Sequence, residues 1–315
     1  MTLTIGVDIG GTKVAGGVVT SDGKVLARTR RDTPADDVAK TRDLIVEVTA
    51  ELAAEYPVRA VGIGAAGWID ADSAMVLFAP NLAWRDEPLR DYVAAAVGLP
   101  VVVENDGNAA AWAEFRFGAG RHADDSMVMY TVGTGIGGGI VLGGELVRGA
   151  HGMAAELGHR QMVPDGRLCG CERRGCIEQY ASGKALVLHA RAAARRTPGR
   201  AAVLLDLAGG DPDAITGPMV TVSAQAGDPV SGEAFIEIGH WLGRGFADIA
   251  QILDPQVLVV GGGVVEAGEL LLGPTRRTYA EELAQRGLWP VAEISAAELG
   301  NVAGVVGAAD LARRI

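Results

Sequence analysis

The sequence predicts an α/β protein built from two related halves. In each half a strand, a glycine turn, a second strand, a tight turn and a third strand follow one another, first over residues 3–30 and again over residues 126–148. A recurrence of this kind indicates an internal duplication. The chain has 315 residues, which is long enough for two hydrophobic cores. We therefore expect two α/β domains with a cleft between them.

The elements of the first half follow from apolar periodicity and turn residues. Strands are expected at residues 3–9, 14–20, 24–30, 58–64 and 100–104. Helices are expected at residues 36–55, 86–97 and 108–117. Asn105 and Asp106 precede the last of these helices, where an N-cap residue stands.

The elements of the second half are predicted from the same apolar periodicity and turn residues. Strands are expected at residues 126–133, 140–142, 145–148 and 256–260. Helices are expected at residues 229–253, 266–286 and 303–315. Residues 197–228 are rich in Gly, Pro, Asp and Ala, which predicts surface connections around a short helix. We place residues 1–117 and the helix at 303–315 in a small domain, and residues 118–302 in a larger one.

Composition excludes several classes of protein. The formal charge is −11 and the pI is near 5.0, so nucleic acid is not expected as a partner. The one local basic cluster, Arg191, Arg195, Arg196 and Arg200, is interpreted as a solvated helix face. No apolar run reaches about 18 residues and no signal peptide is recognisable, so no membrane association is expected. All three cysteines fall within residues 169–176, which argues against a disulfide framework and favours a reduced, cytoplasmic location.

Two glycine turns are candidate phosphate sites. The first contains Asp8, Gly10, Gly11, Thr12 and Lys13, and the second contains Gly133, Thr134, Gly135 and Gly137. Glycines let backbone N–H groups converge on an anion. A carboxylate such as that of Asp8 can hold a water molecule on Mg²⁺. The alternative is that both turns are ordinary hairpin connections, but their pairing favours a polyphosphate ligand.

A dinucleotide site is a second alternative. The pattern G-x-G-x-x-G occurs from Gly133 and again from Gly62. That pattern requires a helix directly after the glycines. A strand is expected after Gly138 and a loop after Gly67, so both matches are weak. The P-loop pattern is absent from the sequence.

His159, Cys169, Cys171 and Cys176 have the spacing H-x9-C-x-C-x4-C. One imidazole and three thiolates complete a closed tetrahedral shell, which predicts a structural Zn²⁺ site. The alternative is three buried free thiols beside an incidental histidine. Which ring nitrogen of His159 would bind the ion is left open by the sequence.

Acidic residues lie beside a predicted strand end and beside the predicted metal ligands. Asp106 follows a predicted strand, where it suits either a helix cap or a catalytic base, with Asn105 as a positioning amide. Glu156 lies three residues before His159 and Glu178 lies two residues after Cys176. The loop at 159–176 that carries the candidate ligands, the metal loop, would therefore hold both carboxylates. Asn81 is a weaker candidate for a polar contact.

The chain resembles the ROK family (repressors, open reading frames and kinases) over essentially its whole length, and is most similar to its bacterial glucokinases. The motifs that carry this resemblance are DIGGTK at 8–13, ENDGNAAA at 104–111, GTGIGGG at 133–139, GMAAELGH at 152–159 and CGCERRGCIEQYASG at 169–183. The resemblance implies a duplicated actin-like (ribonuclease H-like) ATPase fold. Seven residues precede Asp8, so the DNA-binding segment of the family's repressors is not expected.

The resemblance also implies roles for individual residues. It assigns ATP phosphates to Gly10–Lys13 and Gly133–Gly137, with adenosine near Gly261, Gly262 and Gly263. It assigns sugar contacts to Asn81, Asn105, Asp106, Glu156, His159 and Glu178. Asp106 would be the catalytic base, zinc would bind at the His/Cys cluster, and a symmetric homodimer, or a dimer of dimers, is expected.

The predicted reaction is transfer of the γ-phosphoryl group of ATP to the 6-hydroxyl of an aldohexose, with Mg²⁺. Glucose is favoured by overall likeness. Fructose, mannose, N-acetylmannosamine and N-acetylglucosamine remain alternatives, as do polyphosphate as donor and a non-catalytic sugar-responsive regulator.

Overall fold

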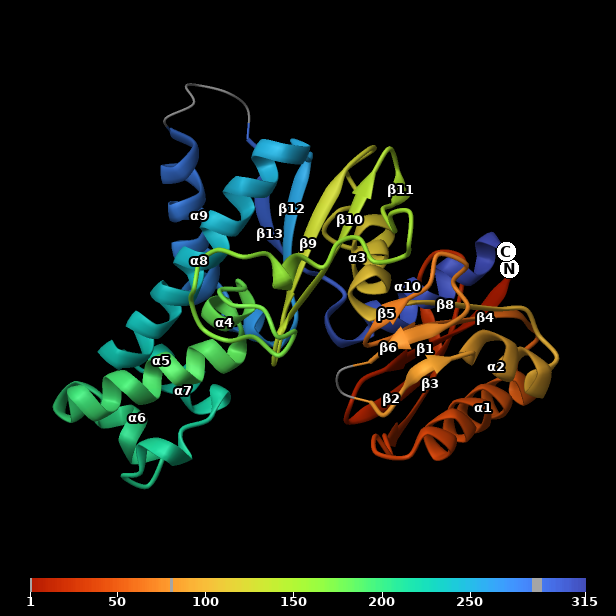
Figure 1. Ribbon diagram of the computed structural model, residues 1–315, viewed down its shortest axis with the longest axis horizontal. Helices are drawn as coiled ribbons and strands as arrows, with labels where there is room; N and C mark the ends of the chain where they lie inside the picture. The colour runs from red at the N-terminus through yellow and green to blue at the C-terminus, as the bar shows by residue number, and fades with distance from the viewer. Residues whose placement is uncertain (1, 80–81, 285–290) are drawn as a thin grey trace. The chain divides into compact units, whose positions relative to one another are not determined.

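The computed structural model describes residues 2–79, 82–284 and 291–315, and the chain divides into two compact units (Figure 1). Unit 1 comprises residues 1–128, 138–155 and 298–315. Unit 2 comprises residues 129–137 and 156–297. Strands β9 and β10 each begin in one unit and end in the other.

The described residues form two five-stranded sheets with the same internal order. The first sheet has the order β3-β2-β1-β4-β8 and the second β11-β10-β9-β12-β13, so in each the first strand lies between its second and fourth. The strands of the first sheet are β1 Leu3–Ile9, β2 Lys13–Val19, β3 Val25–Asp32, β4 Val58–Ala65 and β8 Val101–Asn105. Those of the second are β9 Met127–Val132, β10 Ile136–Leu142, β11 Glu145–Leu146, β12 Val257–Gly261 and β13 Glu293–Ala296. The duplication predicted from the glycine turns is therefore confirmed.

Strand direction follows from the connections. The pairs β1–β2 and β2–β3 are antiparallel, and short turns join them. The pairs β1–β4, β4–β8 and β12–β13 are parallel, which requires a longer crossover between the strands. A small third sheet contains β5 Trp68–Ile69, β6 Val76–Phe78 and β7 Arg85–Glu87. The sequence patterns did not predict this sheet, because its strands have only two or three residues.

The helices agree with the predicted ones at their centres and differ at their ends. The α-helices of unit 1 are α1 Val38–Glu55, α2 Leu89–Val97, α3 Asp106–Phe117 and α10 Ala303–Leu311. Those of unit 2 are α4 Glu178–Ala181, α5 Gly183–Arg196, α6 Ala202–Leu207, α7 Gly217–Gln225, α8 Pro229–Leu253 and α9 Glu269–Ala284.

Three expected boundaries were wrong for identifiable reasons. The helix expected at 86–97 begins only after Pro88, which stands at its N-cap, and residues 85–87 pair as β7 instead. Residues 197–228 contain α6 and α7, so this segment is more helical than its glycine and proline content suggested. The segment expected as one helix from 266 begins as a 3-10 turn, and its predicted end at 286 lies outside the described residues.

Helices cover both faces of the first sheet. Neighbouring residues of a strand point to opposite faces. On β2, a Cβ added to Gly16 would meet Val48 and Leu52 of α1, whereas one added to Gly17 would meet Val305 of α10. Helices α1 and α10 therefore lie on opposite faces of this sheet, and the core of unit 1 lies between α1, α2 and the sheet.

Helix α10 is buried along its whole length and lies against the backbone of the central strands. A Cβ on Gly6 of β1 would lie 1.8 Å from the carbonyl oxygen of Val305, and one on Gly62 of β4 would lie 1.8 Å from that of Ala308. Only glycine fits at these two positions. This close approach fixes the C-terminal helix beside the ends of β1 and β4, which carry part of the candidate site.

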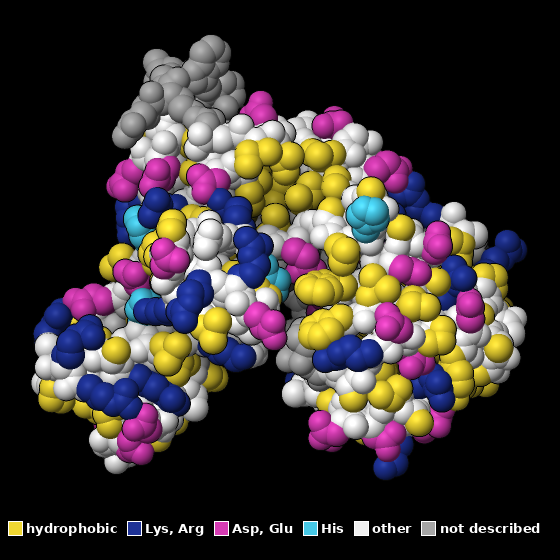
Figure 2. All heavy atoms as spheres, in the orientation of Figure 1, with side chains coloured by type: hydrophobic (Ala, Val, Ile, Leu, Met, Phe, Trp, Pro, Cys, Tyr) yellow, Lys and Arg dark blue, Asp and Glu magenta, His cyan; other side chains and the backbone are white. Residues whose placement is uncertain are grey.

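Unit 2 is built on long helices. Helix α8 packs against α5 and α9, and Phe246 of α8 packs edge-on against Tyr130 of β9 with ring centroids 4.8 Å apart. In Figure 2, Lys and Arg side chains are interspersed with Asp and Glu over the region of α5 and α6. Arg195 pairs there with Asp213 and Arg200 pairs with Glu233, as expected for a solvated helix face. Among the described residues, no helix combines the length and the apolar character that a membrane span requires.

Candidate functional site

Asp8 and Asp106 come together in unit 1. Asp8 lies near the end of β1, and Asp106 begins α3 directly after β8, two strands away in the same sheet. Gly64 of β4 lies between them, since a Cβ added there would be 3.8 Å from Asp8 Oδ1 and 3.7 Å from the Cα of Asp106. The absence of a side chain at Gly64 leaves the two carboxyl groups facing the same space.

The surroundings make both carboxyl groups hard to ionise. Burial, followed by repulsion from Asp106, raises the pKa of Asp8 to about 7. Burial also raises the pKa of Asp106, although hydrogen bonds from the N–H groups of Gly107 and of Asp106 itself oppose that shift. Carboxyl groups with raised pKa values that share a site are typical of acid–base machinery.

The structure separates the roles of Asn105 and Asp106. Asn105, and not Asp106, is the N-cap of α3, since Asn105 Oδ1 accepts a hydrogen bond from the N–H of Asn108 at 3.0 Å. Asn105 Nδ2 also donates to the carbonyl oxygen of Gly67 at 2.9 Å. The Asp106 carboxylate accepts hydrogen bonds from its own turn, including one from the N–H of Gly107 at 2.9 Å. Capping is thus performed by the neighbour, which leaves the Asp106 carboxylate available for chemistry.

A buried ion pair supports this junction. Glu104 is 3% exposed, and its side chain accepts hydrogen bonds from Arg148 Nε (2.5 Å), Asn108 Nδ2 (3.0 Å) and the N–H of Asn105 (2.9 Å). Sequence reasoning assigned no role to Glu104 or Arg148. The two are 44 residues apart, so no local spacing could have paired them.

The sequence patterns also did not predict Gly304 as a residue of the site. It is the second residue of α10, and a Cβ there would lie 2.7 Å from the carboxyl carbon of Asp8. A side chain at this position would displace the carboxylate. The start of α10 therefore belongs to the surroundings of Asp8, although nearly 300 residues separate them in sequence.

The first glycine turn is a hairpin with an exposed polar tip. The N–H of Gly10 donates to the carbonyl oxygen of Lys13 at 2.9 Å. The hydroxyl of Thr33 donates to the carbonyl oxygen of Gly10 at 2.9 Å. The side chains of Thr12 and Lys13 are exposed. The turn is thus a β1–β2 connection that also presents a hydroxyl and an ammonium group to solvent.

The second glycine turn lies in unit 2 and is held by Glu178. Glu178 Oε2 accepts a hydrogen bond from the N–H of Ile136 at 3.0 Å, and a Cβ on Gly135 would lie 2.3 Å from the same oxygen. The carbonyl oxygen of Gly133 accepts from the N–H of Gly183 at 2.8 Å. A side chain at position 135 would therefore displace the Glu178 carboxylate.

Gly262 brings the third predicted nucleotide segment to the same turn. Its φ is +82°, and a Cβ there would lie 2.4 Å from the carbonyl oxygen of Val132, the residue before Gly133. Two segments assigned to ATP from the sequence, 133–137 and 261–263, therefore meet within unit 2. No helix follows the G-x-G-x-x-G matches, since Gly138 lies inside β10 and β5 follows Gly67. The dinucleotide alternative therefore lacks the structure that it needs.

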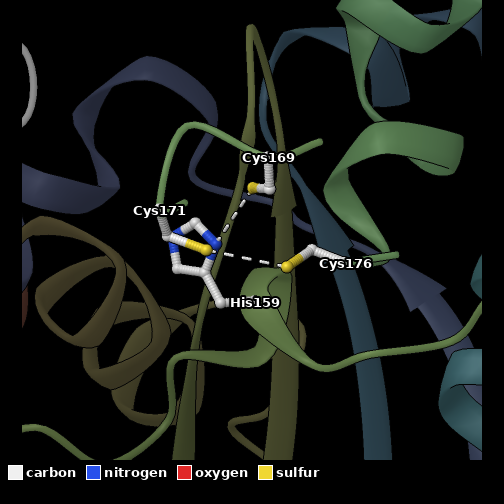
Figure 3. A group of neighbouring side chains, drawn as sticks. All are labelled: His159, Cys169, Cys171 and Cys176. Atoms are coloured by element: carbon white, nitrogen blue, oxygen red, sulfur yellow. Dashed lines mark hydrogen bonds between the residues drawn. The ribbon is translucent and has the colours of Figure 1, made fainter. Parts of the chain in front are cut away.

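The predicted metal ligands converge in unit 2 (Figure 3). Their ligand atoms all lie within 4.8 Å of one another. Cys169 Sγ is 3.6 Å from His159 Nδ1, and Cys171 Sγ is 3.7 Å from Cys176 Sγ. A tetrahedral Zn²⁺ with ordinary bond lengths separates its sulfur ligands by about 3.8 Å, and sulfur from nitrogen by about 3.6 Å. The donor set and its spacing therefore fit zinc.

The fold of the loop explains how these ligands meet. The two arms of the loop pair through antiparallel bridges between Gln161 and Cys176 and between Leu168 and Arg174. Gly175 has a φ of +79°, and a Cβ there would lie 1.7 Å from the carbonyl oxygen of Val163. Burial and the neighbouring thiols raise the pKa of Cys176 to about 12, so a cation is needed to hold this sulfur atom as a thiolate.

The candidate sugar-binding carboxylates flank this cluster. His159 Nδ1 faces the cysteines, while Nε2 lies 4.0 Å from Glu156 Oε2. On the other side, Glu178 Oε1 lies 3.7 Å from Cys169 Sγ. Asn81, the remaining candidate, lies outside the described residues.

Comparison with known proteins gives the geometry its context. The family model described as ROK family matches residues 4–315. The glucokinase of Streptomyces coelicolor is 50% identical over 313 residues, covering 99% of this chain and 98% of that protein. The glucokinase of Thermotoga maritima is 36% identical over 313 residues, covering 98% and 96%.

Among solved structures, a ROK family glucokinase from Streptomyces griseus in complex with glucose and AMPPNP superposes with a TM-score of 0.91. It is 52% identical in sequence and covers 99% of this chain and 100% of that one. The duplicated sheets are therefore those of a two-domain, actin-like sugar kinase. The chain belongs to the ROK family.

Proposed function

We propose that the protein transfers the γ-phosphoryl group of ATP to the 6-hydroxyl of glucose, in the cytoplasm and as a homodimer. The observation that carries the proposal is the Asp106 carboxylate, which the Asn105 cap leaves available beside Asp8. The identities of 50% and 52% to glucokinases over the whole chain support glucose over the other hexoses.

Asp106 is the proposed general base. In the complex, its carboxylate would accept the proton of the sugar hydroxyl from within about 2.6–3.2 Å. Its raised pKa favours this role, because a base works best when its pKa lies near the operating pH. The oxygen of the sugar then forms the new bond to phosphorus while the bond to the leaving ADP oxygen breaks.

The proposed sugar contacts are Asn105, Glu156, His159 and Glu178. Zinc, when bound, supplies a rigid closed shell and no open coordination position. The chain's own residues do the binding. His159 is one of the four residues of the metal cluster, and Glu178 Oε1 lies 3.7 Å from Cys169 Sγ. A bound ion would therefore hold both side chains in place for the sugar hydroxyl groups.

The two glycine turns would hold the phosphate chain. Thr12 and Lys13 offer exposed donors, and the turn at 133–137 adjoins Gly262, where the adenosine is expected. Mg²⁺, when bound with ATP, offsets charge on the phosphates. Asp8 is the carboxylate placed to hold its water ligands. Preorganised donors of this kind are the main source of catalysis in phosphoryl transfer.

A panel of hexoses with ATP and Mg²⁺ tests the proposal. We expect the highest kcat/KM for glucose, with about one zinc ion per chain. Asp106→Asn keeps the size of the side chain and removes the base, so kcat should fall by about 10²–10⁴-fold while glucose still binds. Turnover of Asp106→Asn near that of the wild type would remove Asp106 from the mechanism. A higher kcat/KM for another hexose would overturn the choice of glucose, and sugar binding without turnover would indicate a regulator.

A further inference from the structure

Arg160 directly follows the metal-loop residue His159, and its side chain leaves the loop for helix α8. There Arg160 Nη1 forms an ion pair with Asp248 Oδ2. The side chain of Arg160 is 26% exposed and that of Asp248 is 48% exposed, so the pair lies at the edge of the core. This ion pair ties the loop to the longest helix of unit 2.

The backbone of Arg160 ties the two arms of the loop to each other. Its carbonyl oxygen accepts a hydrogen bond from the N–H of Ile177 at 2.9 Å. Arg160 is adjacent to His159, and Ile177 stands between Cys176 and Glu178. One residue therefore joins the segment that carries the imidazole, the segment that carries the Glu178 carboxylate, and the helix behind them.

Helix α8 has a notch that accommodates this arrangement. A Cβ added to Gly245 would lie 2.7 Å from Ile177 Cδ1, 3.0 Å from Tyr130 Oη and 3.3 Å from Arg160 Nη2. Arg160 Nε and Nη2 and Tyr130 Oη are buried, and none of these three atoms has a hydrogen-bond partner within the described structure. The guanidinium group is therefore held on one side by Asp248 and confined on the other by packing.

From this geometry we infer that the Arg160–Asp248 ion pair is a positioning device for the sugar pocket, which sets the location of the His159 ring and the Glu178 carboxylate relative to α8. The inference rests on the proposed function, which assigns those two side chains to the sugar. Misplacement of binding groups by about 1 Å can cost on the order of 100-fold in rate. Loss of the pair should therefore weaken use of the sugar more than use of ATP.

Variants of both partners test this role. Arg160→Met keeps the length of the side chain without its charge, and Asp248→Asn removes the partner at a half-exposed position. We expect the KM for glucose to rise by about tenfold in each, with the KM for ATP within about twofold of the wild type and zinc content unchanged. The double variant should be no worse than either single variant, and Arg160→Lys should recover part of the loss. Arg195→Met, which breaks the Arg195–Asp213 ion pair on the surface of the same unit, is the control and should leave both KM values unchanged.

A purely structural role gives a different result. If the melting temperature falls while the KM for glucose stays at the wild-type value, or if the glucose and ATP KM values rise together, the inference is wrong. Additive effects in the double variant would also overturn it. The rate of zinc release to a chelator gives a readout that does not depend on activity. It should be faster in Arg160→Met and Asp248→Asn than in the wild type and in Arg195→Met. Wild-type protein that phosphorylates no sugar would refute the proposed function alone. Zinc release would still test the connection between the loop and α8, and equal release rates in the variants and the wild type would count against that connection.

Discussion

At the scale of single residues, the environment of Asp8 links activity to stability. Its pKa of about 7 lies well above the ordinary aspartate value of 3.8. A carboxyl group with a raised pKa favours the folded state only while it is protonated, so its contribution is complete below pH 3.8 and is lost as the pH rises to about 7. Ionisation of Asp8 at neutral pH and above therefore destabilises the folded protein.

Asp8→Asn should remove this cost. The free energy of unfolding of the ligand-free variant should exceed that of the wild type by a margin that grows between pH 5 and pH 8, with an upper limit of about 4 kcal/mol. Denaturant unfolding at both pH values measures it, and Asp36→Asn, at an exposed position in the same unit, is the control. A constant difference between the two pH values would contradict the assignment. Activity should fall, as is common when an active-site residue is optimised for stability.

At the scale of elements, the turn between β9 and β10 depends on a contact made from outside it. A Cβ on Gly135 would lie 2.3 Å from Glu178 Oε2, whose partner is the N–H of Ile136. The turn and the metal loop therefore share one carboxylate. A substitution in the turn should therefore change the KM for the sugar.

Gly135→Ala tests that coupling. The added methyl group must push the Glu178 carboxylate away, so the KM for glucose should rise by about tenfold or more. Steady-state kinetics at varied glucose measures the change. Gly199→Ala, where an added Cβ has no neighbour within 4 Å, should behave as the wild type. An unaltered KM for glucose in Gly135→Ala would mean that Glu178 does not bind the sugar from this position.

The metal loop is the second element with a clear prediction. It has little regular structure of its own beyond two isolated bridges, so the ion should supply much of its stability. Removing zinc with a chelator should lower the melting temperature by several degrees and abolish sugar phosphorylation, and added Zn²⁺ should restore both. Metal analysis and thermal unfolding on the same samples provide the measurement. Full activity in protein shown to be free of zinc would refute a structural role for the ion.

At the scale of the whole molecule, one plan is used twice. Both sheets place the first strand between the second and the fourth, and the glycine turn after the first strand recurs in each. The two copies carry different functional groups. The first has two carboxyl groups with raised pKa values, and the second has the metal cluster and the turn beside Gly262. The two copies therefore share one sheet order and differ in the functional groups that they carry.

The C-terminal helix is needed for the first copy of this plan. Gly62→Ala would place a methyl group 1.8 Å from the carbonyl oxygen of Ala308, against backbone that cannot rotate away. We expect a loss of about 3 kcal/mol in the free energy of unfolding, near the upper end for overpacked cores. Denaturant unfolding compares the variant with Gly199→Ala, which should lie within about 1 kcal/mol of the wild type. A loss as small as that of the control would mean that α10 can shift away from β4.

The sequence by itself determined the duplication and most strand and helix centres, and it predicted that His159, Cys169, Cys171 and Cys176 would lie together. These depend on periodicity and short spacings, which are local properties of the chain. It left the helix cap undecided between Asn105 and Asp106, since both residue types cap helices well. It also overlooked the small sheet, whose strands are too short to show any alternation.

Only the tertiary structure decided which distant residues meet. Glu104 and Arg148 are 44 residues apart, Ile136 and Glu178 are 42 apart, and Arg160 and Asp248 are 88 apart. Gly304 reaches Asp8 only because α10 returns to the first sheet. Such partners are selected by how whole elements pack against one another, and the free energy of that packing depends on the entire core and is not encoded in any short segment.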